Sequence, residues 1–353
     1  MILLLCRPVP VTAQMFNLLG GSSTSTGYAS MAEPSSNELS DLGLTAASVD
    51  NDPYHSTCNQ RGYQSVCDPL FFGQIDMLAL RRDVRHGPGL LWDGDSQIYG
   101  AGSLDQKFSY GPRVTLGMRI LPRTTLEATW FDQKAWDDSE QFFRTNGSLY
   151  TPFGANGFPI NGVEPTDRIQ VGAWSYMNNF ELNVRHWLPQ SNPNIRTSVF
   201  LGPRYIQFVD KINYALGVSP YDFGVNAWND IFGGQLGGSM EFATGWNCWI
   251  NVQGAGGIAG NPYDVEQWNT DISNRRNGNT TTYFGDLEVS FVWRFRPSAA
   301  ITVGYKAIWL ENIAAAAPNI GNDWNGFSAA MLPINDRTNA VFHGPHAGFE
   351  MKY

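Results

Sequence analysis

Residues 113–130 read RVTLGMRILPRTTLEATW, and this stretch decides the fold class. In residues 113–120 every second side chain is apolar, from Val114 to Ile120, while Arg113 and Arg119 lie on the opposite face. A turn at 121–124 follows, and the apolar alternation resumes at residues 126–130. Alternation with a period of two is typical of a β-strand with two unlike faces. The stretch therefore predicts a β-hairpin with one apolar and one charged side.

The same alternation recurs along the chain and predicts about ten strands. They are expected at residues 72–80, 113–120, 126–130, 174–188, 196–210, 228–243, 246–257, 282–295, 299–310 and 340–353. Short connections fall at 121–124, 189–195, 243–246 and 296–299, and long ones at 81–109, 134–172, 211–227, 258–281 and 311–339. Short turns at one end and long loops at the other are typical of an all-β, up-and-down antiparallel transmembrane β-barrel. With ten strands, both ends of the barrel segment are expected at the short-turn end.

Composition agrees with a strand-rich chain. Charged residues make up 16% of the 353 residues and aromatic residues 13%, whereas soluble proteins contain about 25% charged residues. No run of 18 apolar residues is present to form a transmembrane helix. The net charge of −9 argues against a nucleic-acid partner.

The polar face of the predicted strands carries charges on nearly every strand. By alternation it holds Asp76, Arg113, Arg119, Glu127, Glu181, Arg185, Arg204, Glu241, Asp286, Glu288, Arg294, Lys306, Glu350 and Lys352. A soluble barrel would turn this face to water, and a membrane barrel would turn it to the lumen. The equal numbers of acids and bases favour the lumen, where charges are under pressure to pair. Aromatic residues near strand ends, such as Trp130 and Trp293, favour membrane interfaces.

The front of the chain differs from the rest. Residues 1–14 are expected to be the remnant of a signal peptide, 15–68 a flexible Ser-rich segment, and 69–353 the barrel. Cys58 and Cys67 could close a small disulfide loop in an oxidising compartment. A metal site there is less expected, because only His55 lies nearby.

The barrel segment resembles a family of outer-membrane β-barrels of unknown function that is abundant in planctomycetes. The matching stretches are GPRVTLGMRILPRTTLEATWF, FLGPRYIQFVD, NDIFGGQLGGSMEF, LEVSFVWRFRPSAAITVGYKAIWLENI and the terminal HAGFEMKY. The resemblance implies a bacterial outer-membrane location and supplies no catalytic residues. The terminal aromatic resembles the assembly signal of such barrels, so outer-membrane lipid and the barrel-assembly machinery are the expected partners. The Ser-rich front segment departs from the family pattern, and Pro203 inside a strand predicts a β-bulge.

Three functions fit the pattern. A structural or surface-interaction barrel would have a lumen packed with paired charges, which we favour, because a barrel of about ten strands leaves little room. A narrow pore for ions or small solutes would be lined by Arg185, Arg204, Arg294 and Lys306 against Glu181, Glu241 and Glu288. An outer-membrane rim hydrolase would draw on His86, Asp93, Asp95, Asp132, Asp137 and Asp138. No catalytic, cofactor-binding or metal-binding motif is recognisable in the sequence.

Overall fold

The computed structural model describes residues 70–83, 88–103, 107–152, 164–217, 221–245, 247–269, 273–320 and 334–353. All of them belong to the unit Asp68–Tyr353. The predicted signal remnant, the Ser-rich segment and the Cys58–Cys67 pair lie outside the described residues and stay predictions. Within the described residues, no helix is long and apolar enough to cross a membrane.

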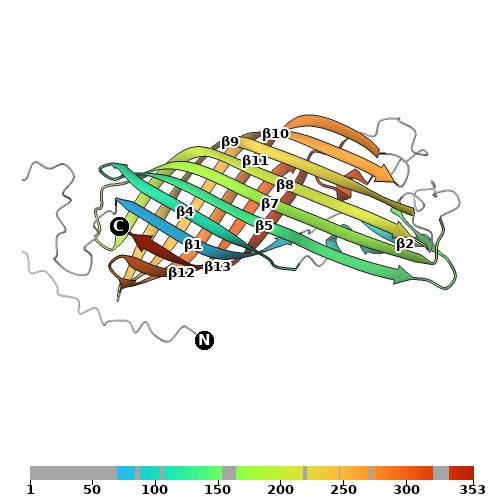
Figure 1. Ribbon diagram of the computed structural model, residues 1–353, viewed down its shortest axis with the longest axis horizontal. Helices are drawn as coiled ribbons and strands as arrows, with labels where there is room; N and C mark the ends of the chain where they lie inside the picture. Colours follow the sequence, from blue (N-terminus) through green and yellow to red (C-terminus); the bar gives the residue numbers. More distant parts are fainter. Residues whose placement is uncertain are drawn as a thin grey trace, which may run out of the picture. The chain divides into compact units, whose positions relative to one another are not determined.

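Ten antiparallel strands close into a barrel in which each strand pairs with its neighbours along the chain (Figure 1). The barrel strands are β1 (Phe71–Asp83), β4 (Ser109–Leu121), β5 (Thr124–Phe143), β7 (Arg168–Trp187), β8 (Ile195–Leu216), β9 (Tyr221–Gly245), β10 (Cys248–Asn269), β11 (Ser273–Arg296), β12 (Ala299–Ile313) and β13 (Thr338–Lys352). β1 closes the ring by pairing with both β4 and β13. The predicted all-β, up-and-down fold with ten strands is confirmed.

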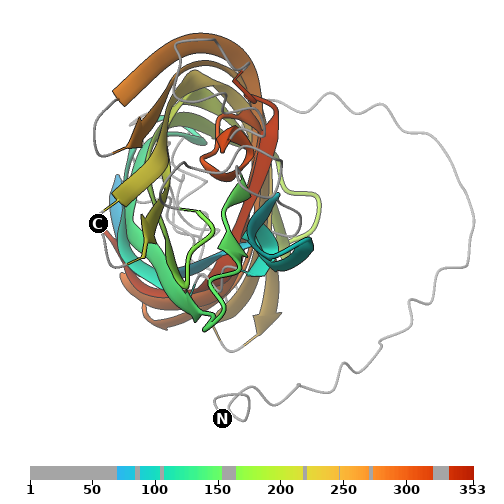
Figure 2. The same ribbon diagram turned by 90° about the vertical axis from the view of Figure 1, so that its right-hand side faces the viewer.

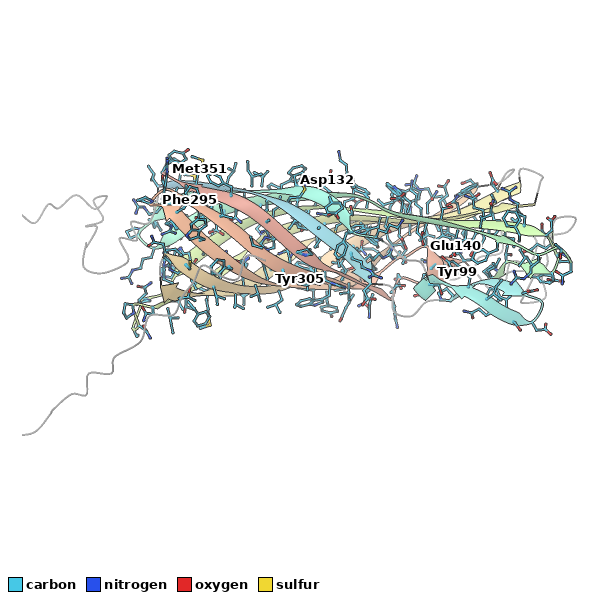
Figure 3. All side chains as sticks on the ribbon, turned by 90° about the horizontal axis from the view of Figure 1, so that it is seen from below. Tyr99, Asp132, Glu140, Phe295, Tyr305 and Met351 are labelled. Atoms are coloured by element: carbon cyan, nitrogen blue, oxygen red, sulfur yellow. The ribbon has the colours of Figure 1, made fainter. Side chains whose placement is uncertain are left out.

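A second, smaller sheet and two short helices lie in the connections between barrel strands. The sheet has the order β3-β2-β6 and consists of β2 (Gly89–Asp93), β3 (Ser96–Gly100) and β6 (Leu149–Tyr150). The two 3-10 helices are η1 (Ala101–Ser103) and η2 (Ala317–Asn319). These elements belong to the end of the barrel opposite the short turns, which we call the far end. Figure 3 shows Tyr99 and Glu140 there, and Phe295 and Met351 at the short-turn end.

Both ends of the barrel segment meet at the short-turn end, as predicted. The N–H of Leu70 donates to the carbonyl oxygen of Tyr353 over 2.8 Å, and Phe72 pairs with Lys352. The predicted bulge at Pro203 is wrong. The pairs Glu181–Arg204 and Val184–Leu201 are three residues apart on both strands, so no residue is inserted between them.

Strand length is where the structure departs most from the sequence prediction. Much of the expected loops at 134–172, 211–227 and 258–281 is strand, because β7 to β11 have 20 to 25 residues each. A tilted strand needs only about 9–11 residues to cross a bilayer. The wall from β5 to β11 therefore continues well past the membrane, whereas β1, β4, β12 and β13 have 13 to 15 residues.

The facing of the short-turn half is that of a membrane-spanning barrel. Its charged side chains, such as Arg113 and Glu181, are buried inside the ring. Its large apolar side chains, such as Leu116, Leu201 and Leu236, point outward and are exposed. Such a band of exposed apolar residues around the barrel suits lipid and would be costly in water.

Candidate functional site

A network of eight titratable side chains crosses the middle of the membrane-spanning lumen. We call it the central network, and it consists of Asp76, Arg113, Glu181, Arg204, Asp286, Glu288, Lys306 and His346. Alternation on seven neighbouring or facing strands turns each of these side chains inward, where all are buried. The network therefore ties opposite walls of the barrel together by charge.

Arg204 connects three strands within this network. Its Nη1 lies 2.6 Å from Oδ2 of Asp286 and its Nη2 3.4 Å from Oε1 of Glu181. Its Nε donates to the Asn179 amide oxygen over 2.7 Å. The side chain is 1% exposed, so this cation exchanges water for two carboxylates and an amide. Burial on this scale is tolerated only where hydrogen bonds and counter-charges compensate it.

Arg113 and Glu288 form the other half of the central network. The Arg113 nitrogens Nη1 and Nη2 donate to the two Glu288 oxygens over 2.6 and 3.0 Å, and Nε donates to Asp76 over 2.9 Å. Lys306 bridges the halves, with Nζ 3.2 Å from Glu288 and 3.5 Å from Asp286. The fork-to-fork geometry of arginine and carboxylate fixes orientation as well as charge.

A separate cluster around Arg185 lies between the central network and the short-turn end. Its Nε lies 2.8 Å from Glu127, and its Nη1 donates to the hydroxyls of Ser198 and Ser239 over 2.8 and 3.0 Å. Its guanidinium carbon lies 4.6 Å from the centre of the Phe200 ring. Arg185 is thus held by charge, hydroxyls and an aromatic face together.

The remaining predicted lumen residues are half-buried, not buried. These are Arg119, Glu241, Arg294, Glu350 and Lys352. Arg294 lies 4.6 Å from the centre of the Trp249 ring, Glu241 lies 3.8 Å from Arg196, and Glu350 lies 2.6 Å from Lys352. The structure thus gathers the predicted set into a buried centre and a more open rim near the short turns.

Beyond the central network the lumen becomes apolar. A layer of buried side chains from nearly every barrel strand fills it, including Phe131, Trp136, Phe208, Ile308 and Phe342. The Phe208 and Phe342 rings meet edge to face at 5.5 Å, and Phe342 lies 4.9 Å from Trp136. Such close aromatic packing occupies the cross-section that a solute would need.

A segment of the β12–β13 connection, residues 314–320, folds into the barrel above this layer; we call it the inner strap. Asn229 accepts from the Ala314 N–H over 2.9 Å and donates to the Ala314 carbonyl over 2.7 Å. Asp210 accepts from the Ala316 N–H over 2.8 Å and pairs with Arg82 at 2.5 Å. Figure 2 shows the red coil of η2, part of the strap, within the ring of strands.

A second apolar cluster closes the far end around the inner strap. Leu90, Tyr99 and Leu149 of the small sheet pack there with inward residues of the long strands, such as Tyr214 and Phe223. The Tyr214 and Phe223 rings are stacked with centres 4.6 Å apart. From the short turns to the far end, the interior is therefore filled by charge pairs, then by the aromatic layer, then by this cluster.

Sequence reasoning missed three members of the interior. Arg82 and Asp210 form a buried pair that also contacts Ser175, and His346 lies 3.1 Å from Glu288. The alternation that found Asp76 and Arg204 puts Arg82 and Asp210 on the same inward face. Arg82 lies just beyond the predicted strand 72–80, whereas Asp210 is the last residue of the predicted strand 196–210 and was not counted with its charged face. His346 and His343 lie three residues apart on β13, so their side chains point to opposite faces, and His343 contacts the Tyr305 hydroxyl.

The acids proposed for a rim hydrolase do not converge. Asp137 is exposed and Asp138 half-buried on β5, and Asp132 is buried lower on the same strand, about midway along the barrel in Figure 3. A hydrogen bond from Ser148, together with Arg144 at 2.6 Å, lowers the pKa of Asp93. A carboxylate held in this way is a poor proton acceptor. His86 lies outside the described residues, and the described ones hold no cluster suited to a metal ion.

No protein-family model matches this chain, and no curated protein matches it. Among solved structures it is similar to the outer membrane protease OmpT from Escherichia coli, with 11% identity, 80% of this chain and 96% of that one covered, and a TM-score of 0.49. The translocator domain of the autotransporter NalP from Neisseria meningitidis has 10% identity, covers 84% and 91%, and has a TM-score of 0.38. Neisserial surface protein A has 11% identity, covers 80% and 97%, and has a TM-score of 0.27. These likenesses are distant, and the chain is an integral membrane β-barrel by its own strand pairing and facing.

Proposed function

We propose that this chain is an integral protein of the bacterial outer membrane that acts through the surface it presents beyond the membrane, and that its centre is closed to solutes. The apolar outward band and closed ring support a place in a lipid bilayer, since only helices and closed barrels span one. Outer-membrane lipid and the barrel-assembly machinery are the partners that this location requires. Membership of the planctomycete-type family stays a prediction.

The filled interior is the main observation in favour of a lumen that is closed to solutes. Each buried carboxylate of the central network lies within 3.5 Å of a cation, and the aromatic layer and inner strap follow above. An ion entering the lumen would have to break pairs that have already lost their water, which costs several kcal/mol for each ion. The pore reading has no comparable support.

The surface role follows from the long strands. Six neighbouring strands from β5 to β11 carry the wall past the membrane, and their outward side chains there are polar or aromatic, as at Trp174, Lys211 and Trp228. The Lys211 ammonium lies 5.1 Å from the Trp174 ring centre and 5.8 Å from that of Trp228. This is a rigid, water-facing surface made of strands where the sequence suggested loops.

Two experiments test the proposal. Membranes washed with carbonate should retain the protein, and recovery in the soluble fraction would contradict the membrane location. The purified protein, inserted in planar bilayers at verified density, should show no conductance steps. Discrete steps that persist at several protein densities would favour the narrow pore instead.

A further inference from the structure

The acids of the central network outnumber its arginines and lysine. Its carboxylates and permanent cations are, in that order, Asp76, Glu181, Asp286 and Glu288, and Arg113, Arg204 and Lys306. Four negative charges therefore meet three positive ones. The two other buried pairs of the lumen, Arg185–Glu127 and Arg82–Asp210, are each balanced in themselves. Counted over the described residues, the buried lumen holds one carboxylate more than its arginines and lysine neutralise.

His346 is the remaining titratable side chain of the network, and it lies against two of the carboxylates. Its Nε2 is 3.1 Å from Oε1 of Glu288, and its Nδ1 is 3.9 Å from Oδ1 of Asp76. Gly304 on β12 makes room for the ring, since a Cβ there would collide with Nε2. The side chain is 0% exposed, so the groups packed around it, and not bulk water, determine the charge of the ring.

The charged groups around His346 come from four strands. Asp76 of β1 and Glu288 of β11 contact the ring, and Lys306 of β12 reaches Oε2 of the same Glu288 carboxylate over 3.2 Å. Nη2 of Arg113, on β4, lies 3.4 Å from Nδ1, but it already donates to Glu288 over 3.0 Å. Arg113 therefore has its acceptor without the imidazole. A ring with two protons would donate to Glu288 from Nε2 and turn its Nδ1 proton toward Asp76.

The proton that would balance the network fits the ring better than a carboxyl group. A free histidine side chain titrates at about pH 6.5, and free carboxyl groups titrate roughly two units lower. At pH 7.5 about one free imidazole in ten is already protonated. A buried charge without a counter-charge shifts an equilibrium by far more than that factor of ten. Charge balance in the buried lumen therefore favours the imidazolium form.

We propose that His346 carries a proton on both ring nitrogens in the folded barrel and is the fourth cation of the central network, so that a bound proton stabilises the closed lumen. With this proton, four cations balance four carboxylates, and the contact with Glu288 becomes a charge-assisted hydrogen bond. Without it, Glu288 and Asp76 lose a counter-charge in a buried site. This inference rests on the closed lumen of the proposed function and adds its regulation by pH.

Nitrogen-15 NMR of the full chain in detergent micelles, labelled at histidine, measures the charge directly. The His346 ring is identified as the signal that His346→Gln lacks. At pH 7.5 this ring should show a proton on each nitrogen. A ring with one proton, which is the form that accepts from Arg113 at Nδ1, overturns the proposal.

Asp76→Asn tests whether charge balance is the cause. It removes one of the four carboxylates and keeps the size of the side chain, so three acids then meet three cations without the proton. The fraction of His346 with two ring protons at pH 7.5 should fall at least tenfold, and an unchanged ring overturns the proposal. Asp137→Asn, at an exposed acid on the outer wall of β5, is the matched control and should leave the ring unchanged. Glu181→Gln gives the same test if the Asp76 variant does not assemble.

Urea unfolding in lipid vesicles between pH 6 and pH 9 measures the stabilisation. The folded barrel keeps a proton that the unfolded chain releases above about pH 6.5, so stability is highest at or below that pH and falls as the pH rises. The unfolding equilibrium constant should rise about tenfold for each pH unit above 7. His346→Gln should lose most of this dependence, and His343→Gln, on the outward face, should keep it. Equal pH dependence in His346→Gln and the natural chain overturns the proposal, whereas conductance steps in bilayers would contradict the closed lumen and leave the NMR result standing.

Discussion

Along the same strands, the short-turn half of this barrel has its apolar side chains on the outward face, whereas the far half has them on the inward face. In the short-turn half of β8, Leu201 faces outward and Arg204 inward, whereas in the far half Lys211 faces outward and Ile212 and Tyr214 inward. Adjacent strands change in the same way, as β9 shows with Leu236 outward and Val225 inward. One barrel therefore contains a membrane half with polar side chains inside and apolar ones outside, and a far half with the reverse arrangement, as in a soluble protein.

The solvent outside each half explains the change. Lipid accepts apolar side chains and rejects charged ones, so the lower lumen must hold the polar set and satisfy it internally. Water accepts polar side chains, so the wall above the membrane can bury its apolar residues inward. The central network and the far-end cluster are thus two solutions to the same packing problem.

The largest effect should come from breaking the central network. Arg204→Met removes the cation that holds Asp286 and Glu181 and leaves their charges undercompensated in a dry lumen. We expect a loss of about 3–5 kcal/mol in the free energy of unfolding, measured by urea titration in lipid vesicles with tryptophan fluorescence.

An arginine of the far half provides the control. Arg275→Met breaks the exposed pair with Asp264 and should cost no more than about 1 kcal/mol. Equal losses for the two variants would mean that the interior charges do not hold the membrane half together.

Arginine substitutions on the outer surface should locate the boundary between the halves. Leu182→Arg places a charge on the lipid face and should cost roughly 2–4 kcal/mol if it lies at mid-membrane. Asn213→Arg lies on the outward face of β8 in the far half, where the side chain is exposed, and should cost about 0.5 kcal/mol or less. The measurement is the folded fraction after assembly into vesicles, and the reverse ranking would contradict the assigned facing.

The membrane half was predictable because its alternation is strong and its composition is unlike that of a soluble protein. Arg113, Glu127, Glu181, Arg185, Arg204, Asp286, Glu288 and Lys306 were all expected inside, and all are buried there. Arg119, Glu241, Arg294 and Glu350 were expected in the same lumen, but they sit at its open rim. Alternation predicts which face of a strand a side chain lies on, but it does not predict how far along the barrel axis that side chain lies.

The far half was not predictable from the same pattern, for a physical reason. Where the outward face changes from Leu and Val to Trp, Lys and Asn, the apolar residues move to the other face, as at Ile169 and Val171. A prediction that expects the same face of a strand to stay apolar throughout therefore ends the strand too early and assigns the remainder to a loop. The inner strap AAAAPNI, at 314–320, carries no sequence signal for burial beyond its small size.

Acid should weaken the far half by a small and assignable amount. A hydrogen bond from Ser273, with help from Asn226, Arg275 and Lys211, lowers the pKa of Glu266 below its ordinary value near 4.5. Because the folded state favours the ionised form, its contribution is present above about pH 4.5 and is lost as pH falls through the lowered pKa. The carboxylate is largely solvated, so the change should stay under about 1 kcal/mol. Urea midpoints between pH 6 and pH 3 should fall less steeply in Glu266→Gln than in the natural chain, and identical slopes would show that this outer-wall carboxylate contributes nothing to stability.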